Sequence, residues 1–111
     1  MTNPNSPNAA SLFSPLASDP DLSELVEMYV EEMPERIATI QNLLDASDWE
    51  SLRRFAHQVK GAAGSYGFDP ISPVAGTVED SIREGAPEEA VRRAVEELLD
   101  MCARARAGMP E

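Results

Sequence analysis

Apolar residues recur at intervals of three and four along most of this chain, the spacing that places side chains on one face of an α-helix. The first such stripe runs from about Asp21 to Leu44, with acidic residues between its apolar positions. Pro34 lies inside this stripe, and a proline within a helix removes a backbone hydrogen bond at a cost of about 3 kcal/mol. Because the stripe stays in phase across Pro34, we predict one long helix with a kink near Val30 to Met33.

Three further apolar stripes predict three further helices joined by short connections. The second helix should cover about residues 49–66, with Ser47 or Asp48 as its N-terminal cap. The third should open at Ser72, which a proline follows, and the fourth should open at Pro87, which two glutamates follow. Four helices without a strand pattern predict an all-α fold, an antiparallel up-and-down four-helix bundle.

The N-terminal segment differs in composition from the rest of the chain. Residues 1–10 are mostly Asn, Pro, Ser and Ala and offer little apolar surface to bury, so we predict a flexible tail. We expect the apolar residues between positions 12 and 16 to form a short capping helix or turn over one end of the core. The chain therefore divides into a tail and cap over 1–18 and a bundle over 19–107.

Composition limits the classes of function. The chain of 111 residues holds nine basic and twenty acidic residues, a net charge of -11, which repels nucleic acid and anionic membranes. The sequence contains neither an apolar run of the ~20 residues that span a bilayer nor a signal peptide, so we expect a cytoplasmic monomer. With one cysteine, Cys102, and one histidine, we predict no disulfide and no metal site, and we interpret Cys102 as a small buried residue.

The candidate chemistry lies in the second predicted helix. His57 and Lys60 are the only histidine and the only lysine, and they are three residues apart. Six side chains of this helix lie within roughly 60° of the direction opposite His57, at about 100° per residue, and they form its core stripe: Leu52, Phe55, Val59, Ala62, Ala63 and Tyr66. The phase therefore predicts that His57 and Lys60 share an exposed face.

Two glycines also lie on the exposed face of His57. Glycine inside a helix costs about 1 kcal/mol relative to alanine, so Gly61 and Gly64 need a reason. Close helix packing would place them on the buried side, and we favour instead a flat surface that another protein can approach. Arg53 and Arg54 make this face basic and are candidates for docking a negatively charged partner. A solvated helix face is an equally good interpretation of these two arginines.

An exposed imidazole can serve as a carrier of a phosphoryl group. Its ordinary pKa of about 6.5 leaves a neutral, nucleophilic ring near pH 7. No second nucleophile or carboxylate pair is evident for acid–base or triad chemistry, and no glycine-rich nucleotide-binding motif is present. A phosphoryl donor must therefore come from elsewhere.

The segment around His57 resembles the signature of the histidine-containing phosphotransfer (HPt) domains of two-component phosphorelays. It reads His57-Gln58-Val59-Lys60-Gly61-Ala62-Ala63-Gly64-Ser65-Tyr66-Gly67. Pro34-Glu35-Arg36 upstream and Val78-Glu79 downstream are also similar to the family, and the resemblance covers roughly 22–105.

This resemblance implies specific roles for the residues of the exposed face. It implies that His57 is phosphorylated, that Lys60 stabilises the phosphoryl oxygens, and that Gly61 and Gly64 leave room for a docked receiver domain. The implied partners are response-regulator receiver domains and a hybrid sensor kinase. The receiver domain supplies the aspartate and the Mg²⁺ ion, so no cofactor is expected in this chain.

Three functions remain open at this point. The chain could carry a phosphoryl group between receivers, it could be the phospho-accepting domain of a chemotaxis-type histidine kinase, or it could be a non-catalytic adaptor that binds receivers. The sequence identifies neither the partners nor the direction of phosphate flow. It also leaves open whether this is a free-standing protein or a fragment of a hybrid kinase.

Overall fold

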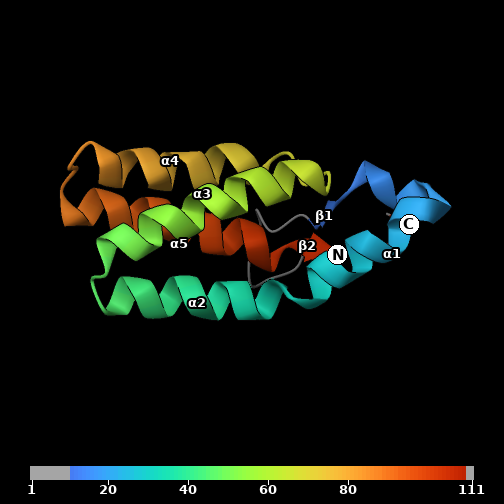
Figure 1. The fold of residues 1–111 in the computed structure, drawn as a ribbon, viewed down its shortest axis with the longest axis horizontal. Coiled ribbons are helices and arrows are strands. Elements are labelled where there is room, and N and C mark those ends of the chain that lie inside the picture. The colour runs from blue at the N-terminus through green and yellow to red at the C-terminus, as the bar shows by residue number, and fades with distance from the viewer. Residues whose placement is uncertain (1–10, 110–111) are drawn as a thin grey trace, which may run out of the picture.

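Helices make up most of residues 11–109, the part of the chain that the computed structural model describes (Figure 1). The elements in order are β1 (Leu12–Phe13), the 3-10 helix η1 (Pro15–Ser18), α1 (Pro20–Glu31), α2 (Met33–Asp45), α3 (Trp49–Ser65), α4 (Ile71–Arg83), α5 (Glu88–Ala103) and β2 (Ala105–Arg106). The all-α class is confirmed, with the addition of one short strand pair. The predicted tail over 1–10 lies outside the described residues.

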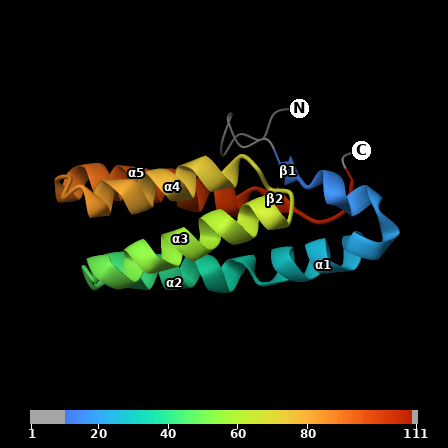
Figure 2. The same cartoon turned by 45° about the horizontal axis from the view of Figure 1, so that its top comes forward.

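The prediction of one long kinked first helix is wrong, because the chain forms two helices there. α1 ends at Glu31 and α2 begins at Met33, with Glu32 between them. Pro34 has no N–H with which to bond the carbonyl of Val30, and its ring crowds that carbonyl. The helix therefore stops and restarts, which places Pro34 in the first turn of α2, where proline is tolerated. α1 projects past the ends of α3, α4 and α5 (Figures 1 and 2).

The predicted start of α3 is confirmed, and that of α4 is two residues late, because Pro70 and not Ser72 is the residue before the helix. Asp48 caps α3, since its Oδ1 accepts a hydrogen bond from the Ser51 N–H at 3.3 Å. α4 begins at Ile71, before the predicted cap Ser72. The Ser72 hydroxyl instead donates to the Lys60 carbonyl at 2.6 Å, which ties the first turn of α4 to α3.

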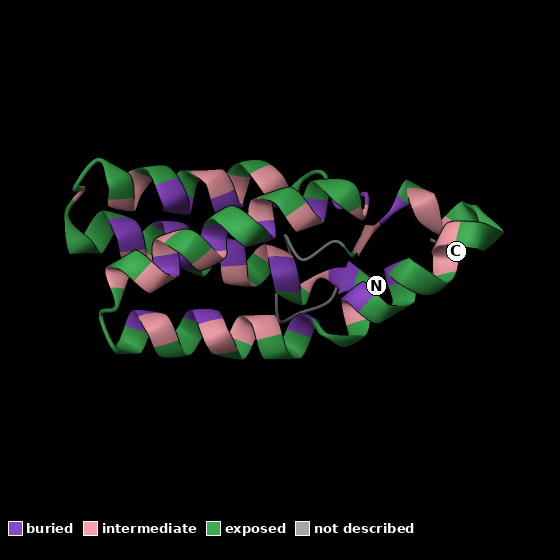
Figure 3. Ribbon diagram, in the orientation of Figure 1, coloured by how far each residue is buried: buried purple, intermediate pink, exposed green. Residues whose placement is uncertain are grey.

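Four helices form a ring of contacts around the core, to which α1 adds Val26 and Tyr29. α3 packs against α4, α4 against α5, α5 against α2, and α2 against α3. Figure 3 shows buried residues on the sides of these helices that face one another. Cys102 is 1% exposed, and burial raises the pKa of its thiol to about 11, so the prediction of a small buried residue is confirmed. Within residues 11–109, no helix combines the length and apolar character required to cross a membrane.

The segment before α1 contains a short helix, η1, as the sequence predicts, and adds the strand β1, which the sequence did not predict. Leu12 pairs with Ala105 in the parallel β1–β2 ladder, and two-residue strands are too short to show an alternating pattern. Ser14, which is 2% exposed, donates its hydroxyl to the Tyr66 carbonyl at 2.6 Å. Gly67, the residue after Tyr66, has φ +82°, and a side chain at this position would overlap Ser14. The connection after α3 therefore fits tightly against the N-terminal segment.

Candidate functional site

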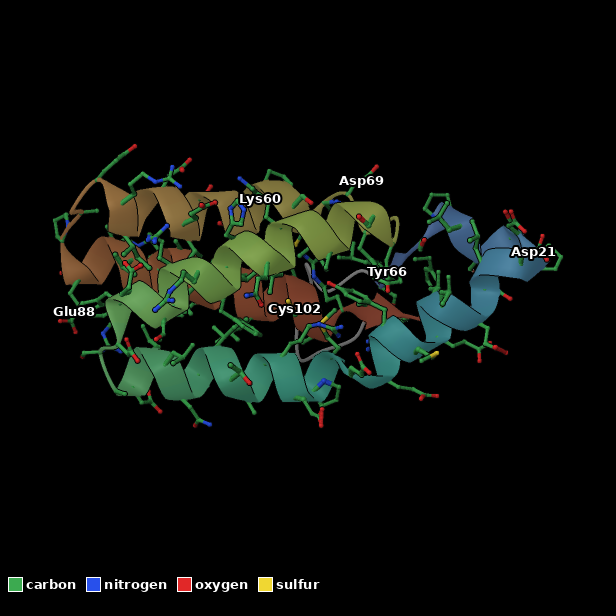
Figure 4. All side chains as sticks on the ribbon, in the orientation of Figure 1. Asp21, Lys60, Tyr66, Asp69, Glu88 and Cys102 are labelled. Atoms are coloured by element: carbon green, nitrogen blue, oxygen red, sulfur yellow. The ribbon has the colours of Figure 1, made fainter. Side chains whose placement is uncertain are left out.

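The candidate site lies where α3 packs against α4. His57 and Lys60 come from α3, and Glu79 and Arg83 come from α4. The His57 side chain is 63% exposed, in agreement with the orientation predicted from helical phase. Figure 4 shows Lys60 on the side of α3 that borders α4.

The buried carboxylate of Glu79 connects these side chains. Glu79 is 1% exposed, and its Oε2 lies 2.9 Å from His57 Nδ1. Lys60 Nζ lies 3.1 Å from Glu79 Oε1, and Arg83 Nη2 donates to Glu79 Oε2 at 2.6 Å. In the sequence, Glu79 is notable only as part of the family resemblance, and it has no predicted role in the site.

Glu79 remains ionised at neutral pH although it is buried. Burial by itself raises the pKa of this carboxyl, but hydrogen bonds from Lys60 and His57 outweigh that effect and hold the pKa below its usual range. An ionised carboxylate only accepts hydrogen bonds. Glu79 therefore provides a fixed negative charge beneath the imidazole.

This contact determines which nitrogen of the imidazole is available. Because Glu79 Oε2 can only accept, His57 Nδ1 carries the proton in the hydrogen bond between them. In the neutral ring Nε2 then holds a free lone pair. The exposed side chain presents this nucleophilic nitrogen to solvent.

Lys60 reaches Glu79 across a glycine that the sequence analysis did not select. A Cβ at Gly76 would lie 3.3 Å from Lys60 Cδ, so Gly76 leaves room on α4 for the aliphatic part of the lysine. A glycine inside a helix costs about 1 kcal/mol relative to alanine. That cost is the sequence signal that could have identified Gly76.

The two glycines of α3 have different surroundings. A Cβ at Gly61 would meet no atom within 4 Å, whereas one at Gly64 would lie 3.3 Å from Ser72 Oγ. Gly61 therefore borders open solvent, as expected of a flat exposed surface. Gly64 is exposed, yet it also lies against the start of α4, so close packing explains part of its presence.

Arg53 and Arg54 lie beside the site and already have a carboxylate partner. Arg53 Nη2 is 2.6 Å from Glu50 Oε2, and Arg54 Nε is 3.6 Å from the same oxygen. Both arginines line a shallow depression with His57, and Glu79 and Arg83 also line it. The structure thus places Arg53 and Arg54 beside His57, with Glu50 compensating part of their charge.

Among residues 11–109 no cluster of His, Cys, Asp and Glu could hold a metal ion.

Comparison with known proteins identifies a domain family. A family model described as the Hpt domain matches residues 24–108. No curated protein and no solved structure matches the chain.

Proposed function

Because the chain belongs to the Hpt domain family, we propose that it carries a phosphoryl group on His57 between receiver domains of a phosphorelay. The observation that supports this most strongly is the exposed imidazole whose Nδ1 is bound to Glu79. The family makes it a histidine phosphotransfer carrier without its own ATP site. We also propose the two partners: one receiver domain donates the phosphoryl group, and a second receiver domain accepts it.

The transfer is a displacement at phosphorus. The lone pair of His57 Nε2 attacks the phosphorus of an aspartyl phosphate, the N–P bond forms, and the O–P bond to the receiver aspartate breaks. The released carboxylate remains on the receiver, whose Mg²⁺ offsets its charge. The reverse step passes the group to the next receiver. Lys60, whose Nζ is 3.1 Å from the same carboxylate that contacts His57, is the cation of α3 that we assign to stabilising the charge added at His57.

We further propose that α2, α3, α4 and α5 form an antiparallel four-helix bundle. The closed ring of contacts among these helices and their short connections support this arrangement. The bundle fixes the backbones of α3 and α4, which hold His57 and Glu79 in register. A rigid scaffold of this kind reduces the ordering required when a partner docks.

The receiver would dock on the exposed face of α3 beside His57. Gly61 borders open solvent there and Gly64 is exposed, so a partner backbone can approach. Arg53 and Arg54 add positive charge that suits the acidic surroundings of a phospho-accepting aspartate.

Gly61→Ala separates docking from folding. Alanine should raise the free energy of unfolding by up to about 1 kcal/mol, because glycine is the poorer helix former and no neighbour obstructs the added methyl group. Phosphoryl transfer should nevertheless become slower, because that methyl group lies where the receiver approaches. Thermal unfolding and the transfer rate measure the two effects. A stabilised variant with an unchanged transfer rate would place the docking surface elsewhere.

The experiment that tests the proposed function is incubation with a phosphorylated receiver and Mg²⁺. The expected product is a phosphate on His57 that is lost in acid and stable in alkali. Labelling by an ATP-bound kinase domain, with no transfer from any receiver, would instead indicate the phospho-accepting domain of a chemotaxis-type kinase. Receiver binding without phosphohistidine would indicate an adaptor.

A further inference from the structure

Arg83 and His57 share one oxygen of the buried carboxylate. Arg83 Nη2 donates to Glu79 Oε2 at 2.6 Å, and His57 Nδ1 lies 2.9 Å from the same atom. Arg83 Nη1 also donates to Asp80 Oδ1 at 3.2 Å, which fixes the guanidinium on α4. Neither the sequence pattern nor the family match assigned a role to Arg83.

The shared oxygen matters because a lone carboxylate favours a protonated imidazole. An opposite charge in contact with a histidine stabilises the imidazolium, and a doubly protonated ring has no lone pair with which to attack phosphorus. Glu79 is needed to fix the Nδ1 proton, yet its full charge would oppose the chemistry at Nε2. A cation on the same oxygen reduces this conflict without removing the hydrogen bond.

Arg83 is not the sole cation on this carboxylate. Lys60 of α3 compensates part of its charge at Oε1, whereas Arg83 acts at Oε2, the oxygen that His57 contacts. Arg53 and Arg54 pair with Glu50, and Asp80 of α4 holds Arg83 itself.

We propose that Arg83 is a positioning residue that offsets the charge of Glu79 at the oxygen that contacts His57 Nδ1. The phosphoryl transfer at His57 rests on the proposed function. The effect of Arg83 on the ring does not, because the titration of the ring can be measured in the unphosphorylated protein.

The test is an NMR titration of the His57 ring in the wild type and in Arg83→Gln. Removing the cation should raise the midpoint of the titration by about one pH unit, the smallest effect expected for a charge within 4–6 Å. For an ordinary imidazole, such a shift lowers the neutral fraction at pH 7 about threefold. The rate of phosphoryl acceptance should therefore follow a pH profile moved to higher pH by the same amount, with its plateau unchanged. Arg83→Lys, which keeps the charge, should restore the wild-type midpoint.

Arg92→Gln is the matched control. Arg92 forms the same i,i+4 pair with Glu88 at 2.8 Å, but that carboxylate is 57% exposed, so its removal should leave the His57 titration unchanged. An unchanged midpoint in Arg83→Gln would overturn the proposal, as would a lower plateau rate without a shift. If the wild type accepted no phosphoryl group, the proposed function would fail while the titration still decided the role of Arg83.

Discussion

Replacing His57 with glutamine is expected to abolish phosphoryl acceptance and leave the fold intact. His57 is the only histidine of the chain, so no second imidazole can take the group. An amide nitrogen lacks the free lone pair that Nε2 supplies. The side chain is 63% exposed, and a glutamine amide can still donate a hydrogen bond to Glu79. The loss of stability should therefore stay below about 1.5–3 kcal/mol, the worth of one hydrogen bond to a charged group. Labelling by a phosphorylated receiver measures the first effect, and circular dichroism during heating measures the second.

Gln41→Ala serves as the control for this experiment. Gln41 is an exposed residue of α2, and its amide donates to Asp45 Oδ1 at 3.2 Å, so it belongs to neither helix of the site. This variant should accept the phosphoryl group at a rate close to that of the wild type. Residual acid-labile label on His57→Gln at the wild-type level would show that another residue is the acceptor.

Helical phase was sufficient to predict the direction of His57, because a single helix determines it. The turn of about 100° per residue relates His57 to Leu52 and Val59 without knowledge of any other element. Capping chemistry is equally local, which is why the cap could be narrowed to Ser47 or Asp48, of which the structure has Asp48. Features of this kind depend on residues within one or two turns of each other.

The break between α1 and α2 was not visible in the same pattern. Glu32 has φ −88° and ψ −2°, close to helical values. A single residue in this conformation hardly changes the rotation of the chain about the helix axis. The apolar stripe therefore continues in phase whether the helix kinks or stops at Glu32.

The role of Glu79 depends on two helices and could not be derived from either alone. At about 100° per residue, Glu79 lies at the edge of the α4 apolar stripe, where a solvated acid would also be ordinary. It is buried because His57 and Lys60 cover it from α3. Periodicity gives each helix its inner face, but it does not give the register of one helix against the next.

Glu79→Gln is expected to slow phosphoryl acceptance by about 10- to 100-fold, the usual cost of losing a residue that orients a functional imidazole. The carboxylate requires the proton on Nδ1, whereas an amide can either accept from Nδ1 or donate to it. Nitrogen NMR should therefore show both neutral tautomers of His57 in this variant and mainly the Nδ1–H form in the wild type. Glu88→Gln, which alters an exposed acid paired with Arg92, should change neither the tautomer nor the rate.

The Glu79→Gln substitution should also change how the free energy of unfolding falls as the pH is lowered. Because the pKa of Glu79 is lower in the folded chain than its usual value, its contribution is fully present above the unfolded pKa of about 4.3. The contribution is lost as the pH falls through the lower folded pKa. Unfolding in denaturant at pH values from about 6 down to 3 should show a shallower loss of stability for Glu79→Gln than for the wild type. Equal slopes would mean that Lys60 and His57 do not stabilise the ionised carboxylate, and the imidazole would then lack the fixed negative charge that orients it.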